Sequence, residues 1–230
     1  MYRGGGYSMI LAEMSLLKEA VQYDLDYFHL ISGADLPIKK WENIDEFFKT
    51  NNGFQFVSFV PQEFQVSMQK RVKYFWLFQE IIGNPRIVIK RKRIGRFFLL
   101  VVQRCFVQLQ KLIHIDRRDK NIKFKMGSNW FSITKDFAQY IVQKEKWIRK
   151  TFKCTLCGDE AFVSTLLENS KFANMTLPNQ RYVDWNRGNP YIFRIDDLNE
   201  LLSCNQIFAR KFDQKIDESV IDAVYTYIKK

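Results

Sequence analysis

The spacing of apolar residues predicts alternating helices and strands at the start of the chain. Four apolar residues recur every three or four positions and predict a helix over about residues 8–22: Ile10, Met14, Leu17 and Val21. An apolar run at 27–32 and an alternating run at 54–60 predict buried strands. Between them, helical spacing at 41–50 ends at a turn signal, Asn51-Asn52-Gly53. This order predicts an α/β layered domain with a largely parallel central sheet.

The rest of the chain is predominantly helical by the same criterion. Residues 66–115 have helical periodicity, interrupted near Gly83-Asn84-Pro85, and residues 123–132 look extended. Between Ile94 and Ile115 the apolar positions are too numerous for one solvated face, so we expect this helix to pack against something. Further helices are predicted at 134–143, 159–169, 196–202 and about 216–228. Because no repeat or linker interrupts the pattern, the sequence predicts one domain over residues 1–230.

Composition excludes two classes of protein. With 230 residues, 47% of them hydrophobic, the chain can bury a core, so disorder is excluded as its main state. The longest unbroken apolar run, 97–102, is far shorter than the ~20 residues that a membrane-spanning helix needs. The first residues also lack the apolar segment of a signal peptide, which predicts a cytoplasmic location.

Positive charge is concentrated in one part of the chain. Residues 70–125 hold sixteen Lys and Arg against three acids, a net +13 that leaves −2 for the rest of the +11 chain. Such a field favours phosphates on nucleic acid, anionic lipid or a nucleotide diphosphate. The basic stretch between Lys90 and Lys111 therefore has two interpretations: a solvated face, or peripheral docking on an anionic cytoplasmic membrane surface.

The cysteines and histidines do not form a recognisable metal site. Cys154 and Cys157 make one CxxC pair, whereas a structural zinc site needs four ligands. The two histidines, His29 and His114, lie in apolar and basic runs that do not complete such a site. We therefore predict no metal site and no disulfide scaffold, with all four thiols reduced.

Four blocks of sequence resemble the core-2/I-branching glycosyltransferases, the family that also holds peptide O-xylosyltransferases. They are YFHLISGADLPIK at 27–39, GSNWFSIT at 127–134, DEAF at 159–162 and IFARKFD at 207–213. The resemblance implies a GT-A-like fold that here lacks its usual N-terminal strands. It also implies an inverting, metal-independent transfer of GlcNAc or xylose from a UDP-sugar to an acceptor hydroxyl of a glycan or surface polysaccharide, with no cofactor. The expected partners are therefore a UDP-sugar donor and a glycan or lipid-linked saccharide acceptor.

The resemblance assigns the catalytic base to Glu160. An inverting displacement needs a carboxylate that takes the proton of the acceptor hydroxyl as it attacks the sugar. The alternative is that Glu160 is simply an acid favoured by the dipole at a helix N-terminus.

The resemblance also assigns cations to the diphosphate. Lys211 matches one member of the family's basic pair, and Arg187 lies one position from the other, with Arg194 as an alternative. Fixed cations are needed because the two phosphates gain negative charge as the sugar leaves. The Asp24-Leu25-Asp26 tripeptide precedes a strand instead of following one, so we do not assign it a metal.

Contacts to sugar are assigned to three residues. Trp185 matches an aromatic residue that stacks on acceptor sugar in the family, and its alternative is a core tryptophan. Asp35 follows a predicted strand near the expected sugar cleft, and its alternative is a turn residue before Pro37. Arg71, with Lys73, lies in the stretch that faces the acceptor in relatives.

Two other functions stay open at this stage. A catalytically inactive sugar-binding relative is one, because the family's first strand-helix-strand unit would be missing if Met1 is the true start. A basic nucleic-acid-binding module is the other, although no zinc-finger, RNP-type or GXXG signature supports it.

Overall fold

The structure is a computed structural model that describes residues 6–82 and 93–229. The chain divides into two compact units. Unit 1 is Met1–Asp26, Ser58–Asn129 and Lys135–Asn174; unit 2 is Tyr27–Val57, Trp130–Thr134 and Met175–Lys230. The single domain over residues 1–230 stays a prediction.

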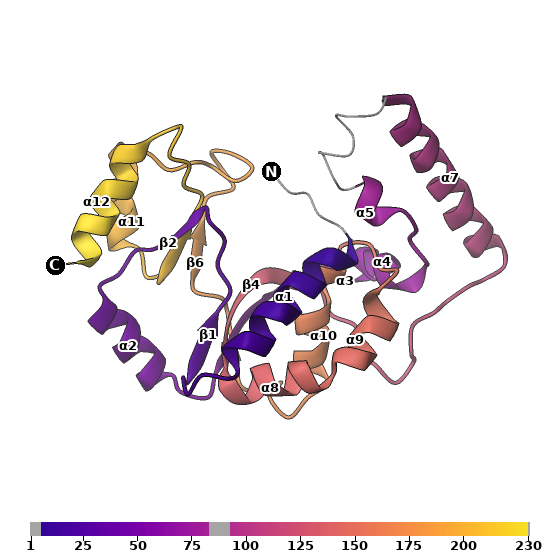
Figure 1. The fold of residues 1–230 in the computed structure, drawn as a ribbon, viewed down its shortest axis with the longest axis horizontal. Coiled ribbons are helices and arrows are strands. Elements are labelled where there is room, and N and C mark those ends of the chain that lie inside the picture. Colours follow the sequence, from indigo (N-terminus) through magenta and orange to yellow (C-terminus); the bar gives the residue numbers. More distant parts are fainter. Residues whose placement is uncertain (1–5, 83–92, 230) are drawn as a thin grey trace. The chain divides into compact units, whose positions relative to one another are not determined.

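Unit 1 is mainly helical. Its helices are α1 (Tyr7–Ala20), α3 (Gln62–Met68), α4 (Lys70–Lys73), α5 (Gln79–Ile82), α7 (Arg93–Leu112), α8 (Lys135–Gln143), α9 (Glu145–Phe152), the 3-10 turn η1 (Gly158–Glu160) and α10 (Phe162–Glu168). The predicted stripe of α1 is buried at Ile10, Met14 and Leu17, and α1 contacts α8 and η1 (Figure 1). In the part of the chain that the structure describes, no helix combines the length and hydropathy required to cross a bilayer.

Two mixed sheets contain the strands. The first has the order β1-β4-β3-β5, from β1 (Tyr27–His29), β4 (Gly127–Thr134), β3 (Gln55–Phe59) and β5 (Thr176–Leu177). In this sheet β1 is antiparallel to β4 and β3 is parallel to β5. The second has the order β2-β7-β6, from β2 (Asp35–Pro37), β7 (Phe208–Arg210) and β6 (Arg181–Val183), with β2 antiparallel and β6 parallel to β7.

The helices of unit 2 are short. These are α2 (Trp41–Thr50), η2 (Ile195–Asp197), α11 (Leu198–Ser203) and α12 (Glu218–Ile228). The predicted C-terminal stripe is buried at Val220, Val224 and Ile228, in one cluster with Phe193 and Phe212. Ile216 lies before α12 and is exposed, so it is not part of that stripe.

The sequence predictions hold best for long periodic elements. α1, α2, β3, α8 and α10 lie where the pattern places them, which confirms an α/β fold. The largely parallel sheet is confirmed only in part, because antiparallel pairs occur in both sheets. Strands β2, β6 and β7 were not predicted, because three residues are too few to show alternation of apolar and polar positions. Helix α9 was not predicted either.

The basic middle of the chain differs from its prediction in two ways. The helical periodicity predicted over 66–115 is wrong at residues 74–78, which are not helical. Tertiary hydrogen bonds hold this segment instead: Trp76 N donates to Cys154 O at 2.9 Å, and Phe75 N donates to Gln110 Oε1 at 2.8 Å. The interruption near 83–85 lies outside the described residues. The helix that was expected to pack against something does so in part: α7 contacts α5 and buries Val107, whereas Phe97 and Phe98 are exposed.

Candidate active site

Glu160 sits in a turn that close packing fixes. Cys157 before it has a left-handed φ of 50°, and Gly158 packs so closely under α1 that a Cβ there would lie 3.0 Å from Ile10 Cδ1. The α10 helix after it is buried over residues 162–167. Glu160 is thus a half-exposed carboxylate on a rigid support, the arrangement that a catalytic group requires.

Arg71 is the partner of Glu160. Arg71 Nη1 donates to Glu160 Oε2, and the two side chains are 28% and 35% exposed. Leu156 N donates to Arg71 O at 3.3 Å, which ties α4 to the loop before η1. The guanidinium fixes the direction of the carboxylate while leaving it accessible to solvent. Arg71, predicted among the acceptor contacts, therefore lies against the predicted base.

Two buried carboxyl groups lie in the same unit. Asp159 is 5% exposed and accepts a hydrogen bond from Asn129 Nδ2, and Glu13 on α1 is 4% exposed. Burial, and then the charge of Glu160, raises the pKa of Asp159 to about 6. Burial, and then the charge of Asp159, raises the pKa of Glu13 well above its usual range. Sequence reasoning missed Glu13, although it stands three positions after Ile10 on the apolar face of α1.

Asp159 should make stability depend on pH. The pKa of Asp159 is raised above the unfolded value of 3.8, so the folded protein favours the protonated carboxyl. The contribution of Asp159 to the free energy of unfolding is therefore fully present below about pH 4 and is lost as pH rises through about 6. We expect Asp159→Asn to remove this loss, which amounts to about 2–3 kcal/mol of unfolding free energy. Urea denaturation of both proteins at several pH values from 4 to 7 measures it.

An exposed acid provides the control for this measurement. Asp136→Asn on α8 should leave the pH profile of the unfolding free energy parallel to that of the unchanged protein. If Asp159→Asn also gives a parallel profile, the buried carboxyl is not the group that titrates.

Unit 2 contains two arginines around one buried carboxylate. Asp35 pairs in register with Arg210 across β2 and β7, and Arg210 Nη1 lies 3.5 Å from Asp35 Oδ1. The other oxygen, Oδ2, accepts from Ser32 N at 2.6 Å, so Asp35 also closes the turn that precedes β2. The geometry of Asp35 is therefore compatible with both roles expected from the sequence, as a turn residue and as a residue of the sugar site.

The cluster of Asp35, Arg181 and Arg210 carries excess positive charge. Arg210 lies 3.9 Å from the ring centroid of Trp130, and Arg181 on β6 lies 5.5 Å from it. Within the described residues, Nε and Nη1 of each guanidinium are buried without a hydrogen-bond partner. Burial lowers the pKa of Arg181 to about 10, with Asp35 opposing this shift and Arg210 adding to it. One carboxylate does not balance two cations, so the cluster is suited to bind an anion.

Lys211 directly follows Arg210 at the end of β7. Its backbone is fixed, since Phe193 N donates to Lys211 O at 2.9 Å. Its side chain is half-buried, and no carboxylate of the described residues pairs with its ammonium. An anion could therefore reach it without displacing an existing partner.

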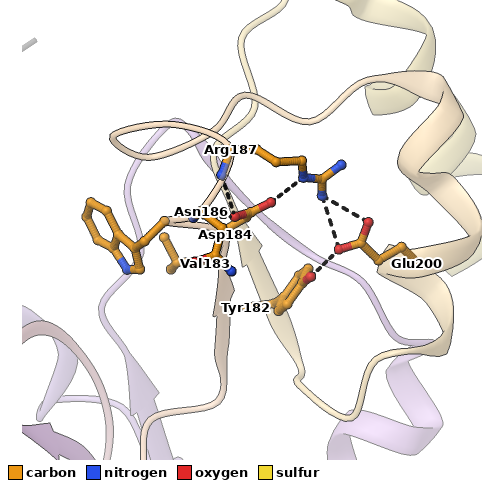
Figure 2. A pocket seen from close by; sticks show the side chains of 7 residues that line it. Tyr182, Val183, Asp184, Asn186, Arg187 and Glu200 are labelled. Atoms are coloured by element: carbon orange, nitrogen blue, oxygen red, sulfur yellow. Dashed lines mark hydrogen bonds and ion pairs between the residues drawn. The ribbon is translucent and has the colours of Figure 1, made fainter.

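Arg187, in contrast, already has three carboxylate partners, of which Figure 2 shows Asp184 and Glu200. Its Nε donates to Asp184, its Nη1 lies 2.6 Å from Asp197 Oδ1, and its Nη2 lies 2.9 Å from Glu200 Oε2. These hydrogen bonds raise the pKa of Arg187. The geometry is that of a structural clamp between the 184–187 loop and α11.

Trp185 lies on the surface of the same loop. It is 60% exposed, so its interpretation as a core tryptophan is wrong. It lines a hollow of ≈ 470 Å³ together with Tyr182 and Arg187. An exposed indole beside a hollow can stack on a sugar ring.

The cysteine pair and Asp24, which were considered as possible metal ligands, do not form a cation site in the described part of the chain. Cys154 and Cys157 are free thiols, and burial raises the pKa of Cys157 to about 11. Over residues 6–82 and 93–229, no group of three or more His, Cys, Asp or Glu side chains is placed to hold a metal. Asp24 pairs with Lys135 at 2.9 Å. Metal independence stays a prediction.

The predicted site residues fall into two sets. Arg71 and Glu160 touch one another in unit 1, whereas Asp35, Trp185, Arg187 and Lys211 belong to unit 2. Sequence reasoning missed Arg210 and Trp130, although both lie inside recognised blocks, and it had no signal for Arg181.

Comparison with known proteins gives one family and a set of distant relatives. The model of the family "Branch: Core-2/I-Branching enzyme" matches residues 2–202. Xylosyltransferase sqv-6 of Caenorhabditis briggsae is 24% identical over 251 residues, which cover 95% of this chain and 28% of that protein. Xylosyltransferase 1 of Rattus norvegicus is 25% identical over 251 residues, covering 97% and 27%. The chain thus spans little more than a quarter of the length of these relatives.

Proposed function

Because this chain belongs to the Core-2/I-branching enzyme family of glycosyltransferases, we propose that it is an inverting, metal-independent transferase with a GT-A-like fold. It moves GlcNAc or xylose from a UDP-sugar to a hydroxyl of a glycan or lipid-linked saccharide. The observation that carries the proposal is the Arg71–Glu160 pair, a half-exposed carboxylate held by a guanidinium within the DEAF block.

Glu160 is the general base in this proposal. It accepts the proton of the acceptor hydroxyl as that oxygen attacks the anomeric carbon from the face opposite the UDP, and the bond from that carbon to the diphosphate breaks. Arg71 is a positioning residue, because its contact is to Glu160.

Lys211 and Arg210 are the cations that meet the diphosphate. Arg210 replaces Arg187 in this role, because Arg187 would have to give up three carboxylates, whereas Arg210 has buried nitrogens without a hydrogen-bond partner in the described chain. Two adjacent cations offset the charge that the leaving diphosphate gains. Asp35 orients Arg210 near the donor sugar, and Trp185 stacks on the acceptor.

A donor assay tests the proposal. We expect UDP release from UDP-GlcNAc or UDP-xylose in the presence of an acceptor saccharide, at a rate that EDTA leaves within about twofold. The physical reason is that side-chain cations, not a bound metal, neutralise the leaving group. A requirement for manganese contradicts the mechanism, and UDP binding without turnover of either donor favours an inactive sugar-binding relative.

A further inference from the structure

α7 is attached to unit 1 along a narrow edge. Three of its residues, Gln103, Val107 and Gln110, are buried. Gln110 holds the helix to the segment before α5: its Oε1 accepts from Phe75 N at 2.8 Å, and its Nε2 donates to Phe75 O at 3.0 Å. Gln103, further along the same edge, has neither side-chain polar atom hydrogen-bonded within the described residues. Leu99 and Phe106, which flank this edge, are half-buried, so the inward side of the helix holds both polar and apolar residues.

The opposite face of α7 is apolar and exposed. Five residues at intervals of three or four positions form this face, which we call the α7 stripe: Phe98, Val101, Cys105, Leu109 and Leu112. At about 100° per residue, the stripe points roughly 180° away from the buried edge. The apolar members of the stripe are between 38% and 74% exposed, and Phe97 beside it is 68% exposed. In Figure 1, α7 is a long helix with α5 next to it.

A surface helix usually turns its apolar residues toward the protein core, whereas α7 leaves this apolar stripe exposed on the other side. Exposed apolar area on this scale marks an interaction surface, because covering it removes apolar groups from water. The stripe runs from residue 98 to 112, a helical length of about 21 Å. An occupant must therefore offer a long apolar layer.

The charges of α7 indicate which kind of partner can cover the stripe. The sequence of the helix holds four basic residues and no acid, and two of the basic residues, Arg104 and Lys111, lie to one side of the stripe. Two copies of α7 packed along their stripes would bring like charges together, which disfavours a dimer. An anionic bilayer offers an acyl layer for the stripe and negative headgroups for the flanking cations.

We propose that α7 lies in the plane of an anionic membrane surface, with the stripe and Phe97 in the acyl boundary and Arg104 and Lys111 among the headgroups. The helix lies on the membrane and does not span it. This inference rests on α7 alone and does not depend on the proposed transfer reaction.

Vesicle co-sedimentation tests the proposal with the full chain. We expect binding to phosphatidylcholine vesicles that contain phosphatidylglycerol, and much weaker binding to pure phosphatidylcholine. The triple variant Phe98→Gln, Leu109→Gln and Leu112→Gln should lower the partition coefficient by at least about 100-fold. Glutamine keeps helix propensity, so the change acts on the stripe.

A matched control separates the stripe from exposed apolar residues in general. Leu11→Gln, Leu16→Gln and Val66→Gln remove three exposed apolar side chains from α1 and α3 and should leave binding unchanged. Arg104→Gln and Lys111→Gln should each weaken binding about fivefold, and added salt should remove this difference.

Two outcomes overturn the inference. The first is equal binding of the stripe variant and the control variant to anionic vesicles, or no binding by the unchanged protein. The second is a stable dimer, seen by light scattering without lipid, that the stripe substitutions dissociate; the stripe is then an interface between two copies.

Discussion

Glu160→Gln is expected to lower the rate of sugar transfer by about 10²–10⁴-fold, because the amide cannot accept the proton of the acceptor hydroxyl. Glutamine has nearly the same shape and can still accept a hydrogen bond from Arg71, so the turn should stay folded. UDP binding should change by less than about twofold, since the diphosphate is assigned to other residues. Turnover with UDP-GlcNAc or UDP-xylose and calorimetric titration with UDP measure the two quantities.

The control for this prediction is Glu46→Gln on α2, an exposed glutamate that should leave both quantities unchanged. Arg71→Gln tests the positioning role, because it should lower kcat while leaving KM for the donor near its original value. If Glu160→Gln retains comparable turnover, the base is another group. If it loses UDP affinity to the same extent as activity, its effect is on binding instead of proton transfer.

The family resemblance singled out Glu160 but gave no indication of its environment. The DEAF block identifies the carboxylate, and helical periodicity places it before α10. The contact with Arg71 is long-range, between residues 89 positions apart, so no local pattern could indicate it. Arg71 was therefore predicted as a site residue with a different partner.

The arginine cluster of unit 2 shows what periodicity cannot reveal. Asp35, Arg181 and Arg210 come from three strands of three residues each, and their proximity follows from strand register. Strands of that length carry almost no alternation, so neither the strands nor their pairing could be read from the chain. α7 shows the converse: its amphipathic pattern was visible in the sequence, but only the structure shows that the apolar side faces outward.

Lys211→Ala is expected to weaken UDP binding by about 10–100-fold, the range for loss of one charged hydrogen-bonding group to a phosphate. The ammonium has no carboxylate partner in the described part of the chain, so its removal leaves no buried charge uncompensated and the fold should stay intact. Arg210→Gln should weaken UDP binding to a similar degree, because Arg210 supplies the second cation and its Nε has no hydrogen-bond partner in the described chain. Calorimetric titration with UDP, with EDTA present, measures both.

Arg187→Gln tests whether Arg187 or Arg210 is the second cation that binds the diphosphate beside Lys211. It removes the same charge from the same unit, but it breaks three ion pairs that hold the 184–187 loop to α11. We therefore expect it to lower the free energy of unfolding and to leave UDP affinity within about threefold in the fraction that stays folded. The opposite pattern is loss of UDP affinity in Arg187→Gln and unchanged affinity in Arg210→Gln. That result would mean that Arg187 binds the diphosphate and that Arg210 only balances the charge of Asp35 beside Trp130.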